Sequence, residues 1–278
     1  MVTIPSSCSA LSCPTVGLSN GLNIPILGLG TSHDGGYSHE AVLYALQECG
    51  IRHIDTAKRY GCEEALGKAV ADSAVPREEL WLTTKLWPGD YGYQSAKQAC
   101  RDSCARLGVD YLDLYLMHWP DCMVPGLSSC EVRAETWRAL EELYDEGLCR
   151  AIGVSNFLIR HLNELKDRGG VVPHVNQVEF HPFQQPLELV EYCRQEDIVF
   201  EGYCPLAKPS LTQRSWSSPV NTAAARHKYA SAGVFRMELS RFLSPPNQTG
   251  SMKTAKFLGS GWMIQTWQLW VCCMMGDM

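Results

Sequence analysis

The chain has 278 residues, of which 45% are hydrophobic and 19% are charged, a composition typical of folded globular proteins. Its formal net charge of −6 excludes the strongly basic surface that nucleic acids and anionic membranes attract. The sequence has no run of about 18 apolar residues, so we expect no membrane-spanning helix.

The N-terminal segment and the cysteines favour a cytoplasmic protein. Residues 1–21 have neither a basic start nor a sustained apolar stretch, so they do not resemble a secretory signal. The 13 cysteines are scattered and have no histidine partners at metal-ligand spacing, even where Cys100 and Cys104 lie one helical turn apart. We therefore expect reduced thiols, no metal site and a cytoplasmic location.

The predicted elements begin with a hairpin and continue as alternating strands and helices. VGLSNGLNIPI predicts a hairpin that turns at residues 19–21. Short apolar runs then predict seven strands, over residues 26–31, 52–57, 80–87, 111–119, 150–157, 174–182 and 198–207. Helical periodicity fills the gaps, most clearly over residues 38–50, 95–108, 133–147 and 186–197.

This alternation predicts the fold class. Strands separated by helices pair in parallel, because each helix returns the chain across the sheet. Seven such strands exceed what a small open sheet needs and favour a closing (β/α)8 barrel, which has roughly 250 residues. An open doubly wound sheet is the alternative.

Polar residues at the ends of the predicted strands indicate an active site. Asp55 and Tyr60 follow the second strand, Lys85 ends the third and His118 ends the fourth. Each has a structural explanation of its own: a helix cap, a half-buried ring, a solvated lysine, a loop histidine. Four such residues together, at the ends of neighbouring strands on the active face of a parallel α/β fold, indicate instead that they take part in one reaction.

The motifs HIDTAKRYG, TTKLW, LMHWP, IGVSNF, NQVEFHP and YCPLAK resemble successive signatures of the aldo-keto reductase superfamily. The resemblance extends from about residue 14 to residue 208. It implies a monomer that reduces an aldehyde or ketone to an alcohol with NADPH, its partner being a small-molecule carbonyl compound. Two alternatives are an inactive truncated relative and a cofactor-sensing binding protein similar to channel-associated members.

The resemblance implies a role for each of the four strand-end residues. Tyr60 is the general acid that protonates the carbonyl oxygen, and the cation of Lys85 makes the phenol a stronger acid. Asp55 pairs with Lys85 and holds its ammonium in place. His118 hydrogen-bonds the substrate oxygen and orients the carbonyl.

The same resemblance implies binding residues for substrate and cofactor. Trp87, Trp119 and His118 line the substrate site, although core packing explains a tryptophan equally well. The residues implied for the cofactor are Thr31 and Asp55 at the ribose, Ser155, Asn156 and Gln177 at the carboxamide, and Tyr203 stacked on the nicotinamide. Gly28 and Gly30 do not form a dinucleotide fingerprint, since no third glycine follows and no helix opens there.

The sequence changes character after Lys208. Residues 209–278 show neither the eighth strand with IPKS-like residues nor the late helices of the family. Permitted codons for residues 231–247, with synonymous bases chosen, read RWSIQNGVVTIPKSTK from their third base. The same shift over residues 262–278 can give DDTNMAALGMLHDGRH. Both strings resemble the missing family segments, so we predict an out-of-frame tail and a barrel, over residues 1–208, that lacks its eighth strand and late helices.

Overall fold

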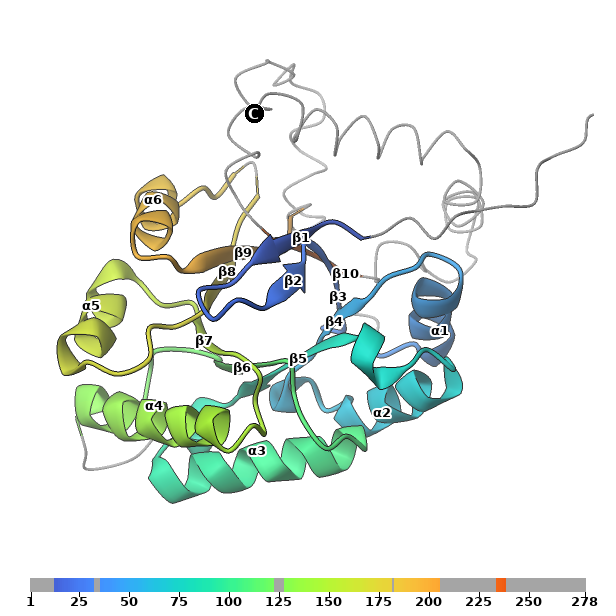
Figure 1. The fold of residues 1–278 in the computed structure, drawn as a ribbon, viewed down its shortest axis with the longest axis horizontal. Helices are drawn as coiled ribbons and strands as arrows, with labels where there is room; N and C mark the ends of the chain where they lie inside the picture. The colour runs from blue at the N-terminus through green and yellow to red at the C-terminus, as the bar shows by residue number, and fades with distance from the viewer. Residues whose placement is uncertain (1–12, 33–35, 123–127, 182, 206–233, 239–278) are drawn as a thin grey trace, which may run out of the picture.

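The computed structural model describes residues 13–32, 36–122, 128–181 and 183–205, together with the backbone of residues 234–238. It opens on a two-stranded antiparallel hairpin formed by β1 (Thr15–Gly17) and β2 (Asn23–Pro25), which confirms the predicted hairpin. The hairpin lies across one end of the molecule, in front of the larger sheet in Figure 1.

Seven parallel strands follow in chain order and confirm the predicted strands. They are β3 (Leu27–Gly30), β4 (His53–Asp55), β5 (Trp81–Leu86), β6 (Leu114–Met117), β7 (Ile152–Ser155), β8 (Val175–Glu179) and β9 (Val199–Tyr203). Each strand pairs with the next one along the chain, so the sheet curls continuously from β3 to β9. The barrel prediction is therefore confirmed over the doubly wound alternative, whose strand order would reverse.

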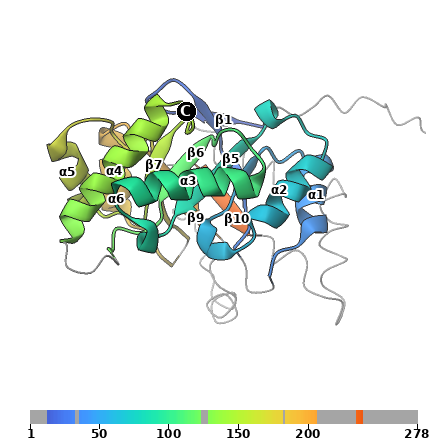
Figure 2. The same cartoon turned by 90° about the horizontal axis from the view of Figure 1, so that it is seen from below.

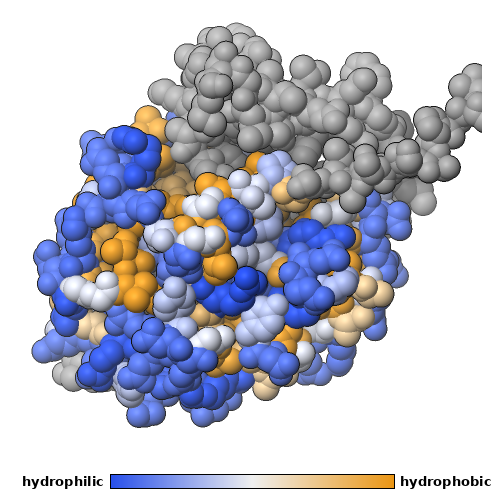
Figure 3. All heavy atoms as spheres, viewed as in Figure 1, coloured by the Kyte–Doolittle hydropathy of each residue, from blue (hydrophilic) through white to orange (hydrophobic). Residues whose placement is uncertain are grey.

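The helices lie outside this sheet (Figures 1 and 2). They are α1 (His39–Gln47), α2 (Glu63–Asp72), α3 (Tyr93–Leu107), α4 (Ser129–Asp145), α5 (Ile159–Arg168) and α6 (Leu187–Gln195), with 3-10 turns η1 (Lys58–Tyr60), η2 (Arg77–Glu79) and η3 (Pro88–Asp90). Serine side chains cap α1 and α4 at Ser38 and Ser128, and Gly108 ends α3 in the left-handed conformation. Hydrophilic residues cover much of the outer surface (Figure 3). No helix among the described residues is long and apolar enough to cross a membrane.

The barrel is closed by β10 (Val234–Glu238). Its backbone pairs in parallel with β3 over residues 235–238 and with β9 over residues 234–235. These residues lie in the segment after Lys208 that was predicted to lack the eighth strand of the family, and whether that segment is out of frame stays a prediction. The pairing of β10 satisfies backbone groups on the edges of β3 and β9. The predicted absence of the late helices and the rest of the predicted out-of-frame tail fall on residues outside those described, and both stay predictions.

Side chains alternate along each strand between the barrel interior and the helices, as the two-residue period of a strand requires. On β5, Leu82 and Leu86 pack in the apolar layer beneath the helices. Trp81 instead joins an apolar cluster with the hairpin residues Leu18 and Ile24, which fills the amino end of the barrel. Lys85, four residues after Trp81, therefore faces the interior.

Gly28 in β3 shows how tightly the interior is packed. A methyl group at this position would lie 2.8 Å from Nδ1 of His53. The His53 ring is fully buried, with Nε2 3.1 Å from Oγ1 of Thr83. The glycine therefore provides the space that the imidazole occupies.

We expect Gly28→Ala to lower the free energy of unfolding by about 1–3 kcal/mol, because the added methyl group overpacks the barrel against His53. Gly17→Ala is the matched control, since its methyl group would meet only Asn23 Oδ1, at 3.9 Å. Urea denaturation of both variants measures the difference. Equal midpoints for the two variants would contradict this account of the interior.

Candidate active site

The four residues predicted to carry the chemistry lie together at the carboxyl ends of the parallel strands. Asp55 is the last residue of β4, Lys85 lies on β5, and His118 directly follows β6. Tyr60 ends η1, the short turn that follows β4, where its backbone N–H donates to the carbonyl of Ala57 at 3.0 Å. Parallel pairing of β4, β5 and β6 brings these ends to the same edge of the barrel.

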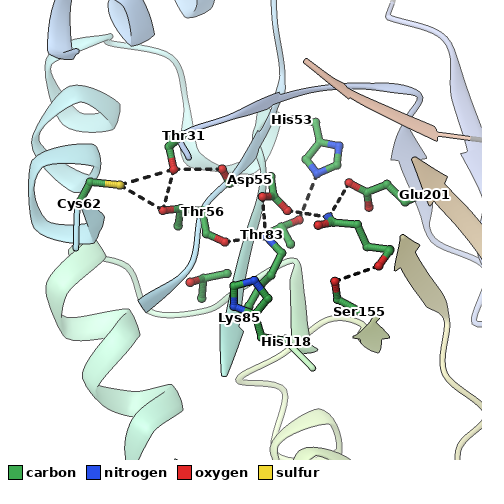
Figure 4. Close-up of polar contacts among 12 residues, drawn as sticks. Thr31, His53, Asp55, Thr56, Cys62, Thr83, Lys85, His118, Ser155 and Glu201 are labelled. Carbon is green, nitrogen blue, oxygen red and sulfur yellow. Dashed lines mark hydrogen bonds and ion pairs between the residues drawn. The ribbon is translucent and has the colours of Figure 1, made fainter. Parts of the chain in front are cut away.

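At the centre of the site Lys85 and Asp55 form an ion pair that is fully buried (Figure 4). Nζ of Lys85 lies 2.5 Å from Oδ1 of Asp55 and donates a second hydrogen bond, of 2.9 Å, to the backbone oxygen of Thr56. Both side chains have an exposed fraction of 0%. Burying a charge is costly unless hydrogen-bond partners replace water, and here the carboxylate and the carbonyl provide those partners.

Aromatic and imidazole rings lie next to this cation at the carboxyl ends of the strands. Nζ of Lys85 lies 5.3 Å from the centre of the Tyr60 ring. The His118 ring is edge-on to both Tyr60 and Trp87, with centroids 5.7 Å and 5.6 Å away. Trp119 stacks near His118 and is 39% exposed. The four predicted residues and both predicted tryptophans therefore form one continuous site, with an apolar wall next to the imidazole.

Ser155, Asn156 and Tyr203 form a connected group on the neighbouring strand ends. Asn156 adopts a left-handed backbone, with φ of 63°, and donates from Nδ2 to the His118 carbonyl at 3.0 Å and to Ser155 Oγ at 3.1 Å. The Tyr203 hydroxyl donates to Asn156 Oδ1 at 2.9 Å, and Ser155 Oγ donates to the Gln177 backbone oxygen at 2.8 Å. These bonds fix the segment after β7 relative to β6 and β9.

The side chain of Gln177 joins this group to the ion pair. Nε2 of Gln177 donates to Asp55 Oδ2 and to Glu201 Oε1, each at 2.8 Å. Carboxylates only accept hydrogen bonds, so the NH2 group of the amide must face them. The carbonyl oxygen Oε1 of Gln177 then points away, and no described residue donates a hydrogen bond to it.

Glu201 was missed by sequence reasoning, although it is fully buried in the site. It lies on β9 two residues before Tyr203. The two-residue period of a strand places both residues on the same face, which is the signal that could have identified it. A carboxylate at that position would have been predicted to face the barrel interior.

Thr31 lies where the prediction placed it, beside Asp55. Its hydroxyl donates to the Asp55 backbone oxygen at 3.2 Å and lies 2.9 Å from Oγ1 of Thr56. Cys62 Sγ approaches the same two hydroxyls at 3.5 Å (Figure 4). The Thr31 hydroxyl therefore stabilises the end of β4 through these hydrogen bonds. Its contact with the ribose stays a prediction.

Among the residues that were assigned to the nicotinamide, Gln177 has the clearest complementarity to that group. A carboxamide has an NH2 group, and Oε1 of Gln177 is the complementary acceptor. The Tyr203 ring is half-buried at the end of β9 with its hydroxyl tethered, so the ring position is fixed. Ser155 and Asn156 already donate their side-chain hydrogens within the protein, so a carboxamide oxygen would have to replace one of those bonds.

Comparison with known proteins identifies the family. A model described as the aldo/keto reductase family matches residues 26–250, which includes every strand of the barrel. The chain belongs to the aldo/keto reductase family. The match continues beyond Lys208, the position after which the sequence was predicted to leave the family pattern.

Individual relatives agree with this assignment. The chain is 48% identical over 195 residues to an uncharacterised oxidoreductase of Caenorhabditis elegans, covering 70% of this chain and 60% of the relative. It is 45% identical over 193 residues to the 9,11-endoperoxide prostaglandin H2 reductase of Trypanosoma cruzi, covering 69% and 65%. The chain thus spans less than two thirds of the length of these relatives. A crystal structure of an aldo-keto reductase of Bombyx mori in complex with NADP superposes with a TM-score of 0.70 at 28% identity, covering 90% and 88%.

Within the described part of the chain, no group of three or more histidine, cysteine or acidic side chains could hold a metal ion. No disulfide bond joins the cysteines described there.

We expect Lys85→Met to lower the free energy of unfolding by about 3–5 kcal/mol, because it leaves the Asp55 carboxylate buried without its cation. Asp55→Asn should have a similar cost for the converse reason. The double variant removes both charges, so its loss should be smaller than the sum of the single losses. Urea denaturation of the three variants and the unmodified chain completes this double-mutant cycle. If the free-energy losses of the two single variants add up to that of the double variant, the two charges do not depend on each other.

Proposed function

We propose that the chain reduces the carbonyl group of a small aldehyde or ketone to an alcohol by hydride transfer from NADPH. The observation that supports this most directly is the buried Lys85–Asp55 pair beside the Tyr60 ring. Family membership and the NADP complex of the silkworm relative support the choice of cofactor. NADPH, when bound, supplies the hydride, and the protein supplies the proton and the positions.

Tyr60 is the general acid. As negative charge develops on the carbonyl oxygen, the Tyr60 hydroxyl donates its proton to that oxygen. The Lys85 ammonium lies beside the Tyr60 ring and stabilises the negative charge that is left on the phenol oxygen when the proton is transferred. Asp55 acts through Lys85, because it holds the ammonium in place.

His118 orients the substrate. Its ring lies edge-on to Tyr60, so a carbonyl oxygen in reach of the phenol is also in reach of the imidazole. A ring N–H that donates to this oxygen stabilises the charge that develops there. Trp87 and Trp119 form the apolar wall against which the rest of the substrate packs.

The residues that would hold the nicotinamide lie on or next to β7, β8 and β9. Tyr203 would offer its ring for stacking, and Gln177 would accept a hydrogen bond from the carboxamide through Oε1. Ser155 and Asn156 would complete the carboxamide site, and Thr31 and Asp55 would contact the ribose. The cofactor held there would supply the hydride.

We expect Tyr60→Phe to lower kcat for a generic aldehyde by about a hundred- to ten-thousandfold, because the ring remains while the proton donor is lost. The affinity for NADPH, followed by quenching of tryptophan fluorescence, should stay unchanged. Tyr192→Phe is the matched control, since its hydroxyl bonds Asn163 on the outer helices and should not affect turnover.

Three outcomes separate the proposal from its alternatives. NADPH binding with turnover that depends on Tyr60 supports the reductase. NADPH binding without turnover of any aldehyde or ketone indicates a cofactor-sensing protein instead. Absence of NADPH binding, together with a near-ultraviolet spectrum of an unfolded chain, identifies an inactive relative.

A further inference from the structure

Arg59 extends the aromatic wall of the site on the side of the solvent. It precedes Tyr60 in η1, and its guanidinium carbon lies 5.3 Å from the centre of the Trp87 ring. Trp87 is also the neighbour of His118, at 5.6 Å between ring centroids. Arg59 and His118 therefore contact the same indole, one as an exposed cation and the other inside the site.

Arg59 differs from the neighbouring cations in its partners. Nζ of Lys58 lies 2.6 Å from Oδ2 of Asp90, and Lys85 is paired with Asp55. Among the residues that the structure describes, no carboxylate forms an ion pair with Arg59. Arg59 is therefore an exposed cation beside the Trp87 ring in a chain whose net charge is −6.

We infer that Arg59 is a specificity-determining residue that selects carbonyl substrates with a carboxylate group remote from the reacting carbon. The inference rests on the proposed function, because it assigns a substrate class to the same site. A guanidinium binds a carboxylate through two parallel hydrogen bonds. The cation–π contact with the Trp87 face restricts the guanidinium, and the absence of a carboxylate partner among the described residues leaves its N–H groups available for such a ligand.

The wall suggests the shape of the substrate as well as its charge. The carbonyl lies beside His118 and Tyr60, and the carboxylate lies at Arg59. Trp87 contacts both positions, so the part of the substrate between them packs against an indole. The structure therefore favours an aldehyde or keto acid in which an apolar spacer, such as an aromatic ring, separates the two groups.

The test compares two aldehydes of nearly equal shape, para-formylbenzoate and para-formylbenzamide, which differ in charge. For the unmodified chain kcat/KM should be higher with the benzoate. Arg59→Gln should lower the ratio of the two kcat/KM values by about three- to tenfold, and Arg59→Glu should lower it further. Raising the ionic strength should weaken the preference of the unmodified chain but not that of Arg59→Gln.

Arg138→Gln is the matched control. Arg138 is also exposed and stacked, with its guanidinium carbon 4.5 Å from the centre of the Tyr93 ring, but it lies on α4 outside the barrel. The substitution removes the same charge and the same kind of stacking, so it corrects for the change in net charge. An equal fall of the ratio in Arg138→Gln and Arg59→Gln would overturn the inference, as would an unchanged ratio in Arg59→Gln.

A binding measurement separates failure of the inference from failure of the proposed function. If neither aldehyde is reduced, the proposed function fails, and the affinities of the two compounds are compared by quenching of tryptophan fluorescence. A benzoate affinity that falls in Arg59→Gln, with the benzamide affinity unchanged, still supports a carboxylate site at Arg59. Equal affinities for both compounds in the unmodified chain exclude such a site.

Discussion

The buried ion pair between Lys85 and Asp55 is the constraint on which the rest of the site depends. A charge can stay inside a barrel only where hydrogen-bond partners replace water, and here these are the Thr56 carbonyl and the Gln177 amide. The two charged residues and their partners come from β4, β5 and β8 or directly follow β4. The ion pair therefore forms only when strands far apart in the sequence surround one interior. Apolar residues would often be at least as stable there. The proposed function would explain the pair, because it holds a cation 5.3 Å from the centre of the Tyr60 ring.

Most of the barrel and most of the site could be predicted from the sequence, because both follow from short periodic patterns. Seven apolar runs gave seven parallel strands, and the strand ends that hold Asp55, Lys85 and His118 do meet. Glu201 was missed because the acidic residue was not assigned to a face of its predicted strand, where it shares a side with Tyr203. The strand β10 was missed because residues 209–278 show no motif of the family, and its pairing with β3 and β9 is seen only in the structure.

The site has two regions of different character. The interior region, formed by Asp55, Lys85, Gln177 and Glu201, is closed to water and tied together by short hydrogen bonds. Its geometry leaves little freedom, because each side chain restricts the orientation of the next. The outer region, formed by Trp87, Trp119 and Arg59, is partly exposed and has few polar contacts. Under the proposed function, the reaction chemistry would depend on the tightly bonded interior, and the choice of substrate on the outer side chains.

The hairpin of β1 and β2 closes one end of the barrel. Leu18 and Ile24 fill the amino end together with Trp81, so this end is sealed by apolar side chains. Under the proposed function, the carbonyl compound and the cofactor would both have to approach Lys85 from the carboxyl end of the strands. The plug at one end of the barrel would then fix the direction of approach at the other.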